Sequence, residues 1–452
     1  MKNILKITAR ICAPIKIGVS LWLIIFFSLC NLYSFQECFS QDNQTKGFKQ
    51  DLVIAEGEEA LFEEAEDYFE DKNYLAALPI YLKLFHRYAG VLEYKYKAGI
   101  CYLFKTDEKH LAVEFLEEML KKKLVAEDLH FYLGRAYHLN YRFDEGIKYF
   151  TKALRQQNIT DERKKEIERL IANCKNGKIL VEKPLEVKIE NIGYPINTKG
   201  SEYVPVISAD EALLIFTYRG PGCTGGQQNE FGVADPKGTY YEDAYMSYKL
   251  GDTWLAPEGI GQNINTTEHN ASIALSSDGQ KLYIYKDTKD KSGDIFVSEL
   301  VGNEWEMPLR LNININTDAW EGSVSLSSDE NTLYFTSERP GGLGGKDIYK
   351  STRRDDGIWD EAVNLGPAIN TPDDDDAPFI HPDGKNLYFS SKGHSSMGGY
   401  DIFLSTLQDD GKWSKPENIG YPINTTDDDI YYVVSANGER GYYSSGRTGG
   451  YG

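Results

Sequence analysis

Asn191-Ile192-Gly193-Tyr194-Pro195-Ile196-Asn197-Thr198 is the stretch that decides the fold, because all of it recurs unchanged at Asn418 to Thr425. Its last three residues, Ile-Asn-Thr, belong to a longer series whose successive steps are 68, 51, 54 and 54 residues. The markers of this series begin at Ile196, Ile264, Ile315, Ile369 and Ile423. A fixed period of this length is typical of stacked repeats and propellers. The sequence therefore predicts a repeat architecture, and with it a recognition surface, over more than half of the chain.

Each period has the same internal order. An acidic stretch follows Ile-Asn-Thr, and then come a turn such as Ser277-Asp278-Gly279 and an aromatic strand such as Leu282 to Tyr285. A glycine-rich loop, an Asp-Ile-aromatic triplet such as Asp294 to Phe296 and a tryptophan complete the unit. Aromatic and β-branched runs between such turns predict short strands. Four strands per period favour the blade of a β-propeller over a parallel β-helix or a sandwich.

Two strings carry a more specific resemblance, Leu275 to Tyr283 (LSSDGQKLY) and Gly344 to Tyr349 (GGKDIY). They resemble the WD40-like repeat of TolB-type propellers. The resemblance implies an all-β propeller over residues 179–452, with four full repeats and part of a fifth. The first repeat departs from the pattern, because the segment Arg219 to Glu242 separates its aromatic strand from its Asp243-Ala244-Tyr245 triplet. We call this segment the blade-one insert.

The two ends of the repeat region suggest how the ring closes. Leu185 to Ile189 stands where other repeats carry the outer strand, so we expect it to complete the last blade and to leave no open sheet edge. The sequence stops at Gly449 to Gly452, where the next Asp-Ile-aromatic triplet is due. We therefore interpret the fifth blade as incomplete and the sequence as truncated. Residues 41–452 made alone should then be poorly soluble or oligomeric, because Tyr442 and Tyr443 would present an open strand edge.

Residues 56–178 have the composition and spacing of helices, and they follow a predicted linker over 41–55. Small and aromatic residues recur at matching separations at Ala65, Tyr68, Ala77 and Tyr81, at Gly134, Tyr137, Gly146 and Phe150, and, with one more turn residue, at Gly99, Tyr102, Ala112 and Leu116. This spacing resembles the tetratricopeptide repeat, although its marker tryptophan is absent. The sequence predicts a last helix over 161–176, capped by Thr160 and ended by Gly177.

The N-terminus has the features of a targeting segment. Four basic residues, Lys2, Lys6, Arg10 and Lys16, precede the apolar run Ile17 to Phe27. This pattern predicts a secretory signal peptide over residues 1–40 with cleavage after Ser40. The alternative is an uncleaved anchor, since apolar character persists to Phe35. Lipidation at Cys30 is disfavoured because the bulky Leu29 precedes it.

Charge and cysteine content agree with an exported protein that does not bind nucleic acid. The formal net charge is −20, which would repel phosphates. Three of the six cysteines lie within the predicted signal, and the others are Cys101, Cys174 and Cys223. Such a scattered set does not form a disulfide framework, so we expect buried or idle thiols.

Few residues suggest chemistry. The acidic stretches Asp373 to Asp376 and Asp427 to Asp429 offer oxygen ligands of the kind that Ca²⁺ takes, but the matching places in other repeats are built differently. We expect these carboxylates to accept backbone N–H bonds in tight turns. Gly393 to Gly398 lacks the second glycine of a nucleophile elbow, and we expect His394 to be a surface loop residue. The sequence predicts no catalytic residue, no cofactor and no metal.

The order of signal, tetratricopeptide array and WD40-like propeller resembles the periplasmic TPR–propeller–OmpA family of Bacteroidetes-type bacteria, which includes the peptidoglycan-binding component of type IX secretion. The resemblance implies a periplasmic, outer-membrane-associated scaffold that binds envelope proteins through its helical repeats and propeller face. Peptidoglycan binding belongs to an OmpA-like domain that this sequence does not contain. The alternative is a propeller-containing hydrolase or peptidase whose catalytic domain is missing. Fold resemblance by itself is weak support for either function.

The propeller face that carries both the links between blades and the glycine-rich loops is where we expect partners to bind. Candidate contact residues in the blade-one insert are Arg219, Gln227, Tyr240 and Tyr241. Candidates outside it are Arg339, Asp373, Asp374 and Asp375. The alternative for the insert is a disordered decoration without a partner.

Overall fold

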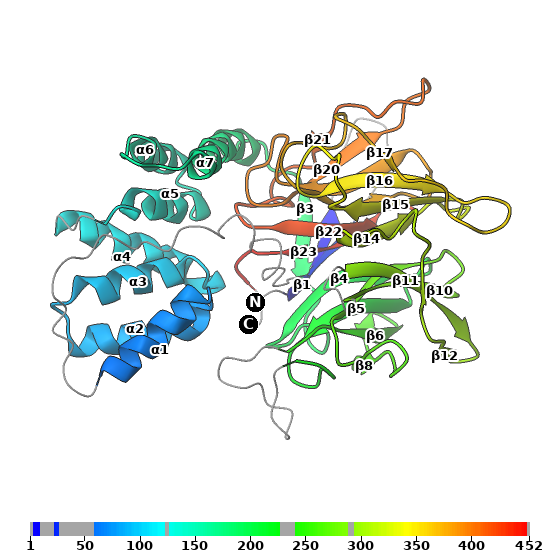
Figure 1. Cartoon of the computed structure of the whole chain (residues 1–452), viewed down its shortest axis with the longest axis horizontal. Coiled ribbons are helices and arrows are strands. Elements are labelled where there is room, and N and C mark those ends of the chain that lie inside the picture. Colours follow the sequence, from blue (N-terminus) through cyan, green and yellow to red (C-terminus); the bar gives the residue numbers. More distant parts are fainter. Residues whose placement is uncertain are drawn as a thin grey trace. The chain divides into compact units, whose positions relative to one another are not determined.

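The computed structural model describes residues 58–122, 126–226, 240–287 and 293–449, together with the backbone of two strands over 3–9 and 22–26. The chain divides into two compact units, a helical unit that ends at Glu182 and a β unit that combines the two N-terminal strands with the residues from Lys183 onward (Figure 1). The predicted cleavage site, the linker over 41–55 and the central part of the blade-one insert with Gln227 lie outside the described residues.

Seven α-helices form the described part of the helical unit. They are α1 (Glu59–Glu70), α2 (Tyr74–Arg87), α3 (Leu92–Tyr102), α4 (Lys109–Lys121), α5 (Leu129–Leu139), α6 (Phe143–Ala153) and α7 (Asp161–Val181). Each helix packs against the next one along the chain. The unit is therefore a row of helical hairpins, as expected for a sequence with locally repeated apolar positions.

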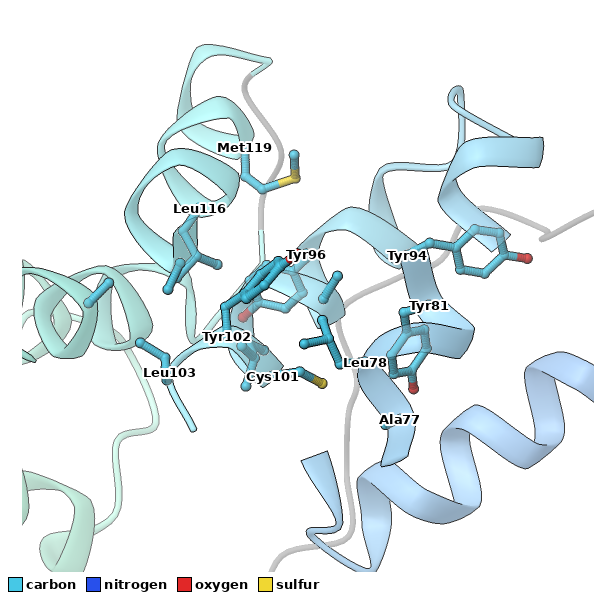
Figure 2. Close-up of a cluster of buried hydrophobic side chains, with 14 of the residues drawn as sticks. Ala77, Leu78, Tyr81, Tyr94, Tyr96, Cys101, Tyr102, Leu103, Leu116 and Met119 are labelled. Carbon is cyan, nitrogen blue, oxygen red and sulfur yellow. The ribbon is translucent and has the colours of Figure 1, made fainter. Parts of the chain in front are cut away.

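Small residues let these helices approach closely. A Cβ atom added to Gly134 in α5 would lie 2.4 Å from Cδ1 of Phe150 in α6, and one added to Gly99 in α3 would lie 3.1 Å from Leu116 in α4. Tyr81 and the side chains around it fill the space between hairpins (Figure 2). Small residues at Gly99 and Gly134 therefore allow the close approach of the two helices within their hairpins.

The end of the last helix differs from the prediction. Thr160 caps α7 as expected, because its hydroxyl accepts a hydrogen bond from the Arg163 backbone N–H at 3.2 Å. Gly177 does not end the helix, which continues to Val181. Gly177 is buried, and Lys178 in the following turn pairs with Asp144 of α6 at 2.8 Å. Packing against α6 therefore outweighs the roughly 1 kcal/mol that glycine costs in a helix interior.

The β unit contains four complete antiparallel sheets, one for each full repeat. The first contains β4 (Ser201–Ile207), β5 (Leu213–Arg219), β6 (Asp243–Leu250), β7 (Thr253–Trp254) and β8 (Glu258–Gly259), and the second contains β9 (Asn270–Leu275), β10 (Lys281–Asp287), β11 (Gly293–Val301), β12 (Glu304–Trp305) and β13 (Leu309–Arg310). The third contains β14 (Glu321–Leu326), β15 (Thr332–Ser337), β16 (Asp347–Thr352) and β17 (Val363–Asn364), and the fourth contains β18 (Asp375–Ile380), β19 (Asn386–Ser391), β20 (Asp401–Thr406) and β21 (Glu417–Asn418).

A fifth sheet joins strands from distant parts of the sequence. It contains β22 (Asp429–Val434), β23 (Arg440–Ser445), β3 (Val187–Asn191), β1 (Asn3–Ala9) and β2 (Trp22–Phe26). The predicted closure by the segment before the first marker is confirmed, since β3 belongs to this sheet. Both N-terminal strands pair with β23 and with β3, β1 in the antiparallel and β2 in the parallel direction (Figure 1).

The sheets pack in sequence and close a ring. The first strands of successive sheets contact one another, and β22 and β23 also contact β4 of the first sheet. At this closing junction Glu211 accepts hydrogen bonds from Arg440 at 3.0 Å and from Tyr442 at 2.9 Å. Each sheet thus acts as one blade of a β-propeller, in agreement with the fold class inferred from the repeat.

Candidate functional site: the link and loop face of the propeller

The links between blades and the loops joining second and third strands lie against each other on one face, which we call the link–loop face. A Cβ atom added to Gly344 would lie 2.2 Å from the carbonyl oxygen of Asp373 in the next link. One added to Gly398 would lie 2.3 Å from the carbonyl oxygen of Asp427. Glycine is required because the loop backbone touches the link backbone. The prediction that both segments share a face is confirmed.

The last part of each acidic link caps a turn. Thr317 donates to the Glu321 carboxylate from its backbone N–H at 2.8 Å and from its hydroxyl at 2.7 Å. The same position holds a buried polar residue in every repeat, namely Glu202, Asn270, Glu321, Asp375 and Asp429. The interpretation of these carboxylates as acceptors of backbone N–H bonds is confirmed. Among the described residues, no group of three or more His, Cys, Asp or Glu side chains is placed to hold a metal ion.

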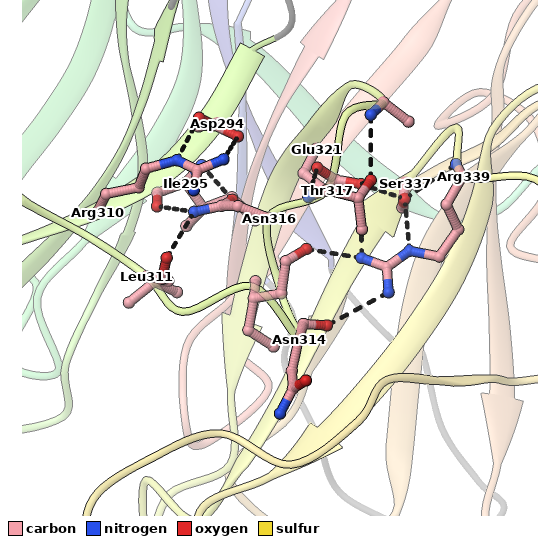
Figure 3. Close-up of polar contacts among 12 residues, drawn as sticks. Asp294, Ile295, Arg310, Leu311, Asn314, Asn316, Thr317, Glu321, Ser337 and Arg339 are labelled. Atoms are coloured by element: carbon pink, nitrogen blue, oxygen red, sulfur yellow. Dashed lines mark hydrogen bonds and ion pairs between the residues drawn. The ribbon is translucent and has the colours of Figure 1, made fainter.

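Arg339 holds its loop to this turn (Figure 3). Its guanidinium donates to the Ser337 hydroxyl at 2.9 Å, to the Ile315 carbonyl at 2.6 Å and to Glu321 at 3.4 Å. Only 14% of the side chain is exposed. Arg447 repeats these contacts in the fifth sheet, with Asp429 as its carboxylate partner. Arg339 therefore donates most of its side-chain hydrogen bonds to groups of its own blade and link.

The asparagine of Ile-Asn-Thr joins each link to the preceding blade. Asn316 accepts a hydrogen bond from the backbone N–H of Ile295 and donates one to its carbonyl, both at 2.8 Å (Figure 3). The same two bonds join Asn265 to Ala244, Asn370 to Ile348 and Asn424 to Ile402. The marker asparagine recurs because its side-chain amide satisfies both the backbone N–H and the backbone carbonyl of a buried residue.

Most of the predicted contact residues in the link between the third and fourth blades are bonded to neighbouring residues. Asp374 pairs with Lys392 at 2.6 Å, and Asp376 pairs with Lys346 at 3.1 Å. Asp375 is fully buried, and burial raises the pKa of its carboxyl to about 7. These carboxylates stabilise the link, and Asp373 and Asp374 are the members of the set that are partly exposed.

His394 is an exposed loop residue, as expected, although its ring also packs against the blade. Its imidazole lies beside the rings of Phe389 and Phe403, with centroid distances of 5.8 and 5.3 Å, and its Nε2 contacts the Ile369 carbonyl oxygen at 2.8 Å. It therefore occupies the place that Arg339 and Arg447 take in their own blades. Desolvation on the side of the ring that faces the blade lowers the pKa of His394, which favours the neutral ring.

The base of the blade-one insert has a charged cluster of its own. Glu242 accepts a hydrogen bond from His269 and pairs with Arg219 at 3.4 Å. The ring of Tyr241 stacks on that of His269 at 4.0 Å. Although burial opposes ionisation, the hydrogen bond from His269 and the charge of Arg219 lower the pKa of Glu242. The hydrogen bond with Glu242 and its charge likewise raise the pKa of His269 against the effect of burial.

This cluster brings together residues that the sequence separates. Arg219 and Tyr241 were predicted contact residues, whereas the part played by His269 was missed. His269 comes from the link between the first and second blades, at the position where later repeats carry Trp320, Asp374 and Asp428. That position contacts the preceding blade, since Asp428 accepts the Tyr400 N–H at 2.9 Å. An alignment of the links in the sequence would have identified His269 as a residue that contacts the preceding blade.

The three described cysteines agree with the sequence analysis. Cys101, Cys174 and Cys223 are buried and form no disulfide bond with one another. Burial raises the pKa of the Cys174 and Cys223 thiols to about 12, so neither is a reactive thiolate at neutral pH. Within the described parts of the chain, none of the helices is long and apolar enough to span a membrane.

Comparison with known proteins gives distant likenesses. No family model and no curated protein match the sequence. A solved structure from Agrobacterium tumefaciens assigned to TolB is 16% identical, with 57% of this chain and 93% of that chain covered and a TM-score of 0.33. TolB from Acinetobacter baumannii is 12% identical, with 58% of each chain covered and a TM-score of 0.35. A puromycin-hydrolyzing peptidase of Mycobacterium tuberculosis is 12% identical, with 52% and 30% covered and a TM-score of 0.30. At these values the likenesses assign no function, and the propeller rests on its strand topology.

Proposed function

We propose that this chain is a non-enzymatic scaffold of the bacterial envelope that binds other envelope proteins through its helical repeats and the link–loop face of its propeller. The observation that carries the proposal is the cluster of Arg219, Glu242 and His269 at the base of the blade-one insert. The cluster fixes both ends of the blade-one insert, the segment that makes the first blade different from the others. Recognition commonly uses such a loop on a rigid support.

Two further features support a scaffold. Most polar side chains on the link–loop face make internal hydrogen bonds, as Arg339, Asp374 and His394 do. The helical unit offers a second surface for binding, because it is a row of hairpins. The spacing of its small and aromatic residues resembles that of a tetratricopeptide array. A periplasmic, outer-membrane-associated location is part of the proposal, and it is supported by the basic and apolar segments at the N-terminus.

The test replaces residues 227–239 by a short Gly-Ser linker and leaves Arg219, Tyr241 and Glu242 in place. The matched control is the double substitution Asp355→Ser and Asp356→Ser, in a turn at the opposite end of the strands. Both variants should keep the circular dichroism spectrum of the parent. Quantitative pull-downs from envelope extract should then show at least one partner that the insert variant loses and the control retains. The same set of partners for all three proteins would contradict a contact at the insert.

A further inference from the structure

The outer strands of the first blade carry a patch of exposed apolar side chains. Tyr248 and Leu250 of β6 are 53% and 72% exposed, and Leu255, just after β7, is 45% exposed. Tyr248 and Leu250 are two residues apart in one strand, so their side chains lie on the same face. Leu255 lies opposite Tyr248 on that face, because its backbone N–H donates to the Tyr248 carbonyl at 2.9 Å. We call these three residues the blade-one patch.

The fold of a blade does not require apolar residues at these positions. The bond between the positions of Leu255 and Tyr248 recurs in the other three complete blades, from Glu306 to Glu299, from Asp360 to Thr352 and from Ser414 to Thr406. The positions are therefore equivalent, and all six residues there are polar. Since polar residues hold the same backbone geometry, the apolar residues of the first blade are available for another contact.

The blade-one patch continues an apolar surface that begins in the core. Met246 lies two residues before Tyr248 on the same face of β6, and it packs against the buried cluster between the first two blades. That cluster contains Ile260 of the first blade and Trp305 of the second. The exposed residues are thus held on a rigid strand next to a packed core.

Acidic residues lie at both ends of the patch. Glu258 is exposed and is paired with Met246, and Asp252 is exposed in the turn that follows Leu250. The neighbouring cation does not offset them on this face, because Lys249 alternates to the other face and lies over the Trp254 ring at 5.6 Å. A ligand that covers the patch therefore meets negative charge at each end, which favours a ligand with positive charge at its ends.

The size of the patch fits a short segment better than a second copy of this chain. Its three side chains expose roughly 300 Å², if each offers about 180 Å² when fully exposed. A stable dimer buries about 800 Å² on each partner. Two copies would also bring the same acidic residues together. Pro257, between β7 and β8, has no N–H to offer and disfavours addition of a strand at this edge.

We propose that the blade-one patch is a docking site for a short segment of a partner protein that has apolar side chains at its centre and Lys or Arg on both sides. The apolar side chains cover Tyr248, Leu250 and Leu255, and the basic ones face Asp252 and Glu258. About 13 Å of strand separates Met246 from Leu250, so an extended segment of about seven residues reaches both acids. The inference goes beyond the proposed function, because this site lies on the outer strands and not on the link–loop face, and either one can fail without the other.

The test presents the full chain to a phage-displayed library of random heptapeptides. Counter-selection uses the double variant Tyr248→Thr and Leu255→Ser, which carries the residues of the fourth blade and should fold because Thr406 and Ser414 make the same backbone bond. We expect the enriched peptides to have an apolar centre with Lys or Arg on both sides. A fluorescein-labelled enriched peptide should bind the double variant about tenfold more weakly than the parent.

Two further variants separate the contributions of charge and of general stickiness. Asp252→Asn with Glu258→Gln should weaken binding of the labelled peptide about threefold at low salt and less at high salt, because salt screens exposed charges. Met307→Ser with Leu309→Ser is the matched control, since it removes two exposed apolar residues from the second blade. This control should bind the peptide as the parent does. If the double variant of the patch does not fold, Leu250→Ser replaces it.

Three outcomes would overturn the proposal. The first is a library in which no peptide distinguishes the parent from the patch variant. The second is an enriched set with acidic flanks or without apolar residues. The third is a different occupant, seen either as a dimer of the parent that the patch variant does not form in sedimentation, or as binding to phosphatidylglycerol vesicles that the patch variant loses.

Discussion

Arg339 offers a sharp test of whether the link–loop face is built for internal stability, because it was a predicted partner contact and the structure gives it an internal role. In Arg339→Ala, the fully buried Glu321 keeps its bonds from Thr317 and Ser337 but loses its cation. Breaking a buried ion pair by removing one partner costs roughly 3 to 5 kcal/mol. The structure allows an independent estimate of that cost.

Glu202 occupies the same position in the first blade with no arginine bonded to it, and burial raises the pKa of its carboxyl to about 8. A carboxyl in such a site is protonated at pH 7. Protonating a carboxyl with an ordinary pKa of 4.5 at pH 7 therefore costs about 3 kcal/mol of folding free energy, because each pH unit above that pKa costs about 1.36 kcal/mol. We expect Arg339→Ala to lose about 3 kcal/mol at pH 7. The loss should fall below about 1 kcal/mol at pH 5, because proton uptake then costs little.

Guanidinium denaturation followed by tryptophan fluorescence measures this loss, since none of the six tryptophans lies between residues 58 and 182. Arg354→Ala is the matched control. That arginine is 47% exposed and lies 3.5 Å from Asp356 and Asp360, so its loss should cost less than about 1 kcal/mol. Adding Glu321→Gln to Arg339→Ala should recover most of the stability at pH 7. A loss under 1 kcal/mol for Arg339→Ala, or one that does not change between pH 5 and pH 8, would refute the reasoning.

Three further changes test other parts of the molecule. Gly134→Ala should destabilise the helical unit by about 1 to 3 kcal/mol in thermal melts followed at 222 nm, because the added methyl meets the ring of Phe150, whereas Gly90→Ala, with open space around it, should be neutral. Equal effects of the two would count against the close approach. Glu202→Gln should raise the Tm at pH 9 and change it little at pH 5. The reason is the raised pKa of Glu202, because of which the stability of the parent falls by at most about 5 kcal/mol as the pH rises from 4.5 through 8. A gain at pH 5 only would contradict that sign. His269→Asn should remove the stability that its raised pKa supplies below pH 6.5 and that fades at higher pH, so variant and parent should differ most in acid. A difference that grows toward pH 9 would exclude the charged pair.

Much of the architecture was determined by the sequence alone. The five markers, the Asp-Ile-aromatic triplets and the glycine loops predicted the blades, and the segment before Ile196 predicted the closing strand. The recurring spacing of small and aromatic residues predicted the helical hairpins. These features are readable because strand and helix periods, turns and repeated contacts are local, and a repeat presents the same evidence several times.

The chemistry of individual side chains was decided only by the tertiary structure. Nothing in the order of residues shows that Arg339 turns inward, that the His394 ring packs beside those of Phe389 and Phe403, or that His269 meets Glu242. The same holds for β1, which pairs with β3 and β23 although both are more than 170 residues away in the sequence. The physical reason is that desolvation, ion pairing and strand pairing depend on which groups the closed ring brings together, and a local pattern does not contain that information.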